Sequence, residues 1–285
     1  LDFQGCRCLV SAWSVQLIMD LPDYAELHCL SNFTFLRGAS HPEELVAQAV
    51  AQGYTSLALT DECSLAGVVR AHLAAKAVGL KFIVGSEMIT IDGLKLIFLA
   101  SNRHGYGNLS ALITLARRRA GKGDYILQRG DLESLAPSGA LPDCLVIWVP
   151  GEAPAAADAA WLAERFLGRV WIAVELHAGP DDAARLETLQ ALGEASGLPL
   201  VATGDVHMHV RARRPLQDVL TALRLKTSVF DAGYALFPNG ERHLRTRLRL
   251  SRLYPPSLLA ETLKIAARCK FSLDKLRYEY PEEII

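Results

Sequence analysis

Acidic residues and histidines recur along this 285-residue sequence at points where short apolar runs end. They are His28, Asp61, Glu62, Glu87, Glu175, His177, Asp205, His207 and His209. Carboxylates and imidazoles are the ligands that Zn²⁺, Mn²⁺ and Fe ions take in proteins. Such ions activate water and hold phosphate oxygens. If the fold brings these side chains together, the sequence indicates the outline of a multi-metal phosphoesterase site.

An alternation of strands and helices is the arrangement that would gather them. The patterns predict strands over 25–28, 56–60, 81–84, 94–100, 145–149, 170–176 and 198–203, and helices over 41–53, 65–78, 106–118, 158–166, 181–195, 215–225 and 257–268. At least six β-α units in series favour a parallel sheet, and seven strands favour its closure into a barrel. Functional residues of such folds lie at the C-terminal ends of the strands.

Each residue also has a simpler interpretation. His28 alone is typical of a hydrogen-bonding rim histidine, Asp61 could cap the following helix, and Glu87 could form a salt bridge. Asp205 and His207 are stronger as a pair, because residues i and i+2 of an extended segment point the same way. The recurrence of such residues at successive strand ends carries more weight than any one of them.

Composition restricts the class of protein. Hydrophobic residues make up 51% and charged residues 21%, which indicates a globular chain. A net charge of −1 gives no overall attraction to nucleic acid or membrane. Six scattered cysteines without a disulfide framework predict a reducing cytoplasm, and no apolar run is long enough to span a membrane.

Residues 1–18 are interpreted as an extension or a start-site artefact, with Met19 as the natural start.

Basic residues cluster in two segments. Arg242, Arg245, Arg247 and Arg249 follow an alternation that predicts a strand face able to contact phosphate. The alternative is a solvated or ion-paired face against a further domain. Arg117–Arg119 lie at a predicted helix C-terminus, where cations complement the helix dipole.

Four motifs resemble those of the polymerase and histidinol phosphatase (PHP) family. They are Glu26-Leu27-His28-Cys29-Leu30-Ser31, Ala58-Leu59-Thr60-Asp61-Glu62, Gly85-Ser86-Glu87 and Ala202-Thr203-Gly204-Asp205-Val206-His207. More narrowly, the chain is similar to the N-terminal domain of bacterial C-family polymerases of the error-prone, damage-tolerance branch. The resemblance covers residues 19–285, with a core at about 24–226 and a C-terminal extension at about 227–285. It implies a distorted seven-stranded β/α barrel with an extra C-terminal helical or hairpin segment.

Carried over residue by residue, the family's metal ligands are depleted here. The resemblance retains His28, Glu87, Asp205 and His207, whereas other ligand positions hold Leu30, Arg37, Glu62, Lys95 and Trp148. Arg37 and Lys95 would repel divalent ions and pair with the remaining acids, while Leu30 and Trp148 would fill space. We therefore expect no metal in this domain. The alternative is one Zn, Mn or Fe ion on the four retained residues, with His177 or His209 replacing a lost ligand.

The resemblance implies a non-catalytic structural role within an error-prone DNA polymerase. Nucleotidyl transfer with Mg²⁺ would then take place in a region that follows Ile285. The alternatives are an active metal-dependent 3′–5′ exonuclease or phosphoesterase, and an interaction module. The expected partners are the rest of the polymerase chain, DNA through the full-length protein, the sliding clamp and other damage-tolerance proteins, in the cytoplasm and without a membrane.

Overall fold

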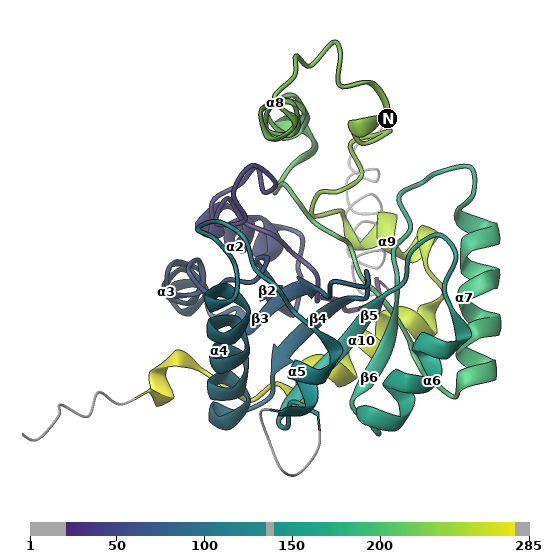
Figure 1. The fold of residues 1–285 in the computed structure, drawn as a ribbon. Helices are drawn as coiled ribbons and strands as arrows, with labels where there is room; N and C mark the ends of the chain where they lie inside the picture. Colours follow the sequence, from purple (N-terminus) through teal and green to yellow (C-terminus); the bar gives the residue numbers. More distant parts are fainter. Residues whose placement is uncertain (1–20, 135–139, 277–285) are drawn as a thin grey trace, which may run out of the picture.

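The computed structural model describes residues 21–134 and 140–276, which fold around one seven-stranded sheet. Its strands pair in sequence order, and their bounds are β1 Ala25–Glu26, β2 Ser56–Leu59, β3 Lys81–Ile89, β4 Lys95–Ala100, β5 Cys144–Val149, β6 Val170–Val174 and β7 Leu200–Ala202. The sheet curls, with helices on its outer side (Figure 1). The seven-stranded α/β fold expected from the sequence is confirmed.

One strand departs from the parallel sheet that the sequence predicted. β4 is antiparallel to both β3 and β5, whereas all other neighbours are parallel. The expectation of an all-parallel sheet was wrong here because only a short turn joins Ile89 to Lys95, and a turn of that length reverses the chain. As a result, the first residue of β4 lies at the edge where the other strands end.

Side chains of α10 (Pro256–Arg268) and the residue after it complete the interior of the curled sheet. Alternate strand residues and Ile265, Ala266 and Cys269 form one buried apolar cluster. Thr262 of α10 accepts a hydrogen bond from the backbone nitrogen of Ala25 in the edge strand β1 (3.1 Å). Beyond the strand ends, Cys29 and Val206 form a parallel bridge that links the two edges of the sheet. The barrel is thus closed by a helix and a bridge.

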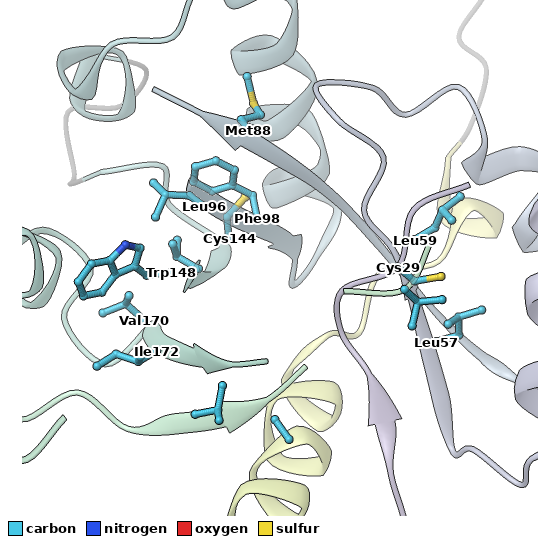
Figure 2. Close-up of a cluster of buried hydrophobic side chains, with 14 of the residues drawn as sticks. Cys29, Leu57, Leu59, Met88, Leu96, Phe98, Cys144, Trp148, Val170 and Ile172 are labelled. Carbon is cyan, nitrogen blue, oxygen red and sulfur yellow. The ribbon is translucent and has the colours of Figure 1, made fainter. Parts of the chain in front are cut away.

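A second apolar layer lies between the sheet and the outer helices. These helices are α2 Pro42–Ala51, α3 Val68–Val78, α4 Arg103–Arg118, α5 Arg129–Ser134, α6 Ala156–Arg165 and α7 Asp182–Ser196. Trp148 belongs to this outer layer, together with Leu96 and Phe98 (Figure 2). The placement of Trp148 in the pocket was therefore wrong, because side chains alternate along β5 and those of Leu145 and Ile147 take the inner face.

The second half of the predicted basic strand is helical, since Arg247 and Arg249 lie in a helix whereas Arg242 and Arg245 precede it. In chain order, this part of the protein contains the 3₁₀ turn η1 (Arg211–Arg213), α8 (Arg214–Leu225), the 3₁₀ turn η2 (Gly233–Ala235), α9 (Arg247–Leu253), α10 and the 3₁₀ turn η3 (Leu273–Lys275). The side chain of Thr246 accepts a hydrogen bond from the backbone nitrogen of Arg249 (3.1 Å) and caps α9. A helix start thus overrode the alternation of arginines.

Three sequence predictions concern parts of the chain without a description. The interpretation of residues 1–18, the start at Met19 and the domain limit at residue 285 all lie outside the described residues. Within the described part, no helix has the length and apolar character needed to cross a membrane.

Candidate functional site

His28 is the centre of a buried polar cluster at the rim of the barrel. It follows β1, and none of its side chain is exposed. Its Nε2 lies 2.7 Å from Oε2 of Glu87, and its Nδ1 lies 2.6 Å from Oε1 of Glu175. A neutral imidazole carries only one N–H, so two carboxylate neighbours require the doubly protonated ring. Burial opposes this charge, but Glu175 and Glu87 outweigh burial and raise the pKa of His28.

Glu87 on β3 is held by cations. Its Oε1 accepts a hydrogen bond from Nη1 of Arg37 (2.7 Å), and its Oε2 lies 3.0 Å from Nζ of Lys95. Burial alone would raise the pKa of Glu87. Lys95 and the His28 hydrogen bond outweigh burial and hold that pKa well below its ordinary value. Arg37 also pairs with Glu62, so one guanidinium joins two carboxylates.

Arg37 reaches Glu87 because Asp61 fixes the loop that carries it. The Asp61 carboxylate accepts hydrogen bonds from the nitrogen and hydroxyl of Ser31 and from the hydroxyl of Thr34, each 2.7 Å long. The backbone nitrogen of Arg37 then donates to the oxygen of Thr34 (3.0 Å). Gly38 closes this loop, since a Cβ there would lie 1.9 Å from the oxygen of Ser31. Asp61 is therefore a loop anchor, neither a helix cap nor a free ligand.

Lys95 enters the cluster because β4 runs backwards. As the first residue of an antiparallel strand, it lies beside Ile89, two residues beyond Glu87 on β3. In a parallel strand the same position would lie at the opposite end of the barrel. The topology thus places a lysine over the glutamate of the PHP-like motif.

Asp205 and His207 form the other side of the cluster. Nε2 of His207 lies 3.1 Å from Oδ1 of Asp205, which is itself 3.6 Å from Nε2 of His28. Asp205 adopts a left-handed backbone conformation (φ 43°), one that Asp tolerates better than most residues. Burial, reinforced by Arg37, lowers the pKa of His207 to about 3. His207 is therefore neutral at physiological pH, in contrast to His28.

Arg242 pairs with the second oxygen of Asp205, a contact that the sequence did not indicate. Its guanidinium also stacks on Phe237, 4.2 Å from the ring centre. The contact arises because the backbone oxygen of Arg242 accepts a hydrogen bond from the nitrogen of His207 (3.0 Å), which brings the two segments together. No short-range sequence signal could have found it. The Tyr125 hydroxyl, which donates to Glu62 (3.0 Å), was missed for the same reason.

The remaining basic residues of this segment do not share one face. Arg245 is 2% exposed, and its guanidinium donates to the backbone oxygen of Leu176 (2.7 Å). Arg247 pairs with Asp23, and Arg249 lies 3.5 Å from Glu241. Contact with phosphate by these side chains stays a prediction.

Other residues singled out from the sequence lie around the cluster. Leu30 is fully buried. His177 Nε2 lies 3.2 Å from the oxygen of Gly204, and burial followed by Arg242 lowers its pKa to about 4. His209 bonds to the hydroxyl of Ser40 (2.8 Å), away from Glu87. Neither histidine is placed among the ligand atoms that converge on His28.

A cavity of about 910 Å³ opens over the cluster. Its lining includes cations and acids in similar number: Arg37, Lys95, Arg117 and Arg224 with Glu62, Asp124 and Asp205. His28 and Glu87 have no exposed surface. A molecule that entered the cavity would therefore meet Arg37 and Lys95 before it met the two retained ligands beneath them.

Three side chains offer atoms that could hold a metal ion. Ligand atoms of His28, Glu87 and Asp205 lie within 4.8 Å of one another. However, both oxygens of Glu87 already face Arg37 and Lys95, and Asp205 faces Arg242. A divalent ion would have to displace three cations and a proton of His28, since metal ligands must offer free lone pairs. The residues as arranged do not fit such an ion.

A model of the PHP domain matches residues 26–160, which include His28, Asp61 and Glu87. This part of the chain is therefore similar to the PHP domain.

The chain is also similar to proteins named "Error-prone DNA polymerase". It is 81% identical to the one from Dechloromonas aromatica (strain RCB), over 94% of this chain and 26% of the relative. It is 60% identical to that of Methylococcus capsulatus over 92% of this chain, and 53% identical to that of Pseudomonas aeruginosa over 97%. The chain thus spans about a quarter of the length of the curated relatives it matches.

Two solved structures share part of the fold. One is a putative metal-dependent phosphoesterase from Bifidobacterium adolescentis, with 16% identity, a TM-score of 0.43, and coverage of 65% of this chain and 88% of the other. The second is an amidohydrolase from Chromobacterium violaceum with bound sulfate and no metal, with 15% identity, the same TM-score and the same coverage.

Proposed function

We propose that this chain is the N-terminal PHP domain of an error-prone DNA polymerase that acts in DNA damage tolerance. We further propose that the domain is a non-catalytic structural support. One observation carries this second step: side-chain cations occupy the neighbourhood of every acid in the cluster. Arg37 and Lys95 face Glu87, Arg37 faces Glu62, and the other pairs are His28–Glu175 and Arg242–Asp205.

Charge balance explains how the fold would survive without metal. Four clustered carboxylates repel one another strongly at a buried rim. In a metal site, divalent ions offset that repulsion. Here three permanent cations and the His28 imidazolium face the four carboxylates of Glu62, Glu87, Glu175 and Asp205. The pairs also join the β1–α2 loop, β3, β4 and the segment after α8, so the cluster connects the barrel in place of ions.

The chemistry of the full-length protein would lie elsewhere. The relatives are about four times as long as this chain and carry a polymerase name. Nucleotidyl transfer with Mg²⁺, and contact with DNA, would then belong to the rest of the polymerase chain. The sliding clamp and other damage-tolerance proteins are the partners that this role implies.

A second candidate function rests on the three converging ligand atoms of His28, Glu87 and Asp205. If one divalent ion displaced the cations, it could activate water as in metal-dependent phosphoesterases. His207, next to Asp205, would be the fourth ligand. This alternative predicts metal uptake together with 3′–5′ exonuclease or phosphoesterase turnover.

Metal analysis and a nuclease assay separate the two functions. We expect the full-length protein, purified without added metal, to hold no bound Zn, Mn or Fe at this domain by mass spectrometry. It should also not degrade 3′-labelled single-stranded DNA when Mn²⁺ or Zn²⁺ is added. Metal-dependent exonuclease turnover that Asp205→Asn abolishes would contradict the non-catalytic proposal.

A ligand-restored variant provides the positive control. Leu30→His, Arg37→Glu, Glu62→His and Lys95→His together remove two cations and supply lone pairs at positions where the resemblance places ligands. Because Trp148 faces the outer layer, it is left unchanged. The variant should take up about one equivalent of Zn²⁺, since uptake is set by the number of deprotonated ligands available. If the variant and the natural sequence take up equal zinc, the cations are not what excludes it.

A further inference from the structure

On α8, polar residues face the protein and apolar residues face outward, the reverse of most surface helices. Its buried residues include Gln217 (1% exposed) and Thr221 (4%). Leu216, Val219 and Leu223, with exposed fractions of 39%, 43% and 57%, point to the outside. An isolated surface helix normally buries its apolar stripe and exposes its polar face. In α8, therefore, much of the apolar stripe faces outward.

The outward residues form one continuous stripe. Leu216, Val219, Leu220 and Leu223 are spaced i, i+3, i+4 and i+7, which places them within one side of a helix. We call these four residues the α8 apolar face. In Figure 1, α8 stands apart from the sheet, at the opposite side of the molecule from the segment after α10.

A hollow beside the α8 apolar face could receive a side chain. Leu216 and Leu220 line a hollow of about 250 Å³ together with Phe35 and Leu36 of the β1–α2 loop. Phe35 is 81% exposed, so the aromatic ring extends the apolar area past the helix. Interfaces typically place their strongest contacts in such desolvated hollows. An apolar stripe next to a hollow is therefore more than scattered exposed leucines.

α10 shows what a satisfied helix of the same protein looks like. Its large apolar residues Leu258, Leu259 and Ile265 are between 0% and 7% exposed. They pack on the barrel, and the charged residues Glu261 and Lys264 lie on the outer side and pair with each other. The same chain thus buries the apolar stripe of one helix and exposes that of another.

We propose that the α8 apolar face is the docking surface for the rest of the full-length polymerase chain. This inference rests on the proposed function. The relatives continue for about three quarters of their length outside the region they share with this chain. α8 lies within the region similar to the polymerases, which covers 94% of this chain. A surface of this segment thus suits a partner found in polymerases.

The surface also specifies the chemistry of the docking segment. Arg224 and Lys226, at the end of α8, are exposed. A helix or loop with an apolar face and flanking acids would match this arrangement. α8 also contributes Gln217 and Arg224 to the wall of the cavity over the ion-paired cluster, so a segment docked on the apolar face would contact the same helix that borders that cavity.

Photo-crosslinking in the full-length polymerase tests the docking surface. A benzophenone amino acid replaces Leu223, or replaces Leu167 as the control, which is 85% exposed in the turn before β6, at the other end of the barrel. We expect the Leu223 probe to crosslink within one chain to a peptide that follows residue 285. The Leu167 probe should give at least about tenfold less of that product, as expected for a site outside an interface.

Each other outcome overturns the docking surface. Crosslinks from position 223 to a second copy, crosslinks to a different protein, or no enrichment over position 167 would all contradict it. The proposed function is scored separately by DNA synthesis in the same preparation. A protein that synthesises DNA but lacks the crosslink refutes only the docking surface, whereas a protein that cannot synthesise DNA refutes the proposed function.

A matched pair of charge substitutions gives an independent readout. Leu223→Glu would place a carboxylate inside the interface, while Leu167→Glu would leave it in water. In the full-length protein, we expect limited proteolysis to release this domain at least about fivefold faster with Leu223→Glu, because a weakened interdomain contact exposes the linker. Equal release rates for the two variants would contradict the proposal.

Discussion

Glu26 and Glu87 are both buried on the same barrel, yet their surroundings are opposite in kind. Glu26 accepts hydrogen bonds from the backbone nitrogens of Leu27, His28 and Gly204 and from the Tyr24 hydroxyl, at 2.9 to 3.1 Å. Glu87 faces Arg37, Lys95 and the His28 ring. Burial raises the pKa of Glu26, whereas cations hold the pKa of Glu87 well below its ordinary value.

The difference shows two ways to bury a carboxylate. Around Glu26, the dipoles of the backbone N–H groups and of the Tyr24 hydroxyl stabilise the carboxylate with little net charge. Gly204 belongs to that arrangement, since a Cβ there would lie 2.3 Å from Oε2 of Glu26. Around Glu87, several charges must balance one another, so the loss of any one leaves the others unpaired. Glu26 is held by uncharged donors, whereas Glu87 joins β3, β4 and the β1–α2 loop through charged groups.

The largest expected effect comes from neutralising Glu87. Glu87→Gln would leave Arg37, Lys95 and His28 without their shared anion, so we expect it to lower the free energy of unfolding by about 3–5 kcal/mol. Glu26→Gln keeps an acceptor oxygen for the backbone nitrogens and should cost about 1–2 kcal/mol. Urea denaturation of both variants measures the comparison. Equal losses would mean that the cations around Glu87 contribute nothing beyond hydrogen bonding.

The pH dependence of stability should depend on His28. Because its folded pKa is raised above the unfolded value of about 6.5, its contribution is complete below that pH and is lost as pH rises through the folded pKa. The free energy of unfolding should fall there by at most about 1.4 kcal/mol per pH unit. In His28→Asn, this decrease should disappear.

Acid acts on the same cluster with the opposite sign. The folded pKa values of Glu87 and Glu175 are lowered, so their contribution is present above about pH 4.5 and is lost as pH falls further. Denaturation midpoints from pH 3 to 9 measure both limits. A natural-sequence profile that matches His28→Asn above pH 6.5 would show that His28 is neutral in the folded protein.

The smallest effect should come from the outer edge of the cluster. Tyr125→Phe removes the hydrogen bonds that its hydroxyl makes with Glu62 (3.0 Å) and with the backbone nitrogen of Ile89 (2.9 Å). We expect a total loss of about 0.5–1.5 kcal/mol, because the ring stays in place and Arg37 still pairs with Glu62. A loss as large as that of Glu87→Gln would place Tyr125 at the centre of the network.

Sequence patterns predicted most strands and helices but failed where distant segments decide the outcome. The strands of 56–60 and 145–149 were placed within one residue, since buried apolar runs bounded by turns have few other solutions. The direction of β4 was missed because the preceding strand was predicted to end at residue 84, whereas β3 runs to Ile89 and leaves only a short turn before Lys95. The helix at Arg247–Leu253 was missed because the Thr246 cap competes with an alternation of arginines.

The sequence by itself determined which groups are available at the rim: His28, Glu87 and Asp205 remain, and Arg37 and Lys95 replace ligands. Only the tertiary structure decided which charges meet. The antiparallel β4 brings Lys95 to Glu87, and the segment that pairs with His207 brings Arg242 to Asp205. The physical reason is that ion pairing depends on distances between atoms far apart in the chain, which spacing along the sequence does not specify.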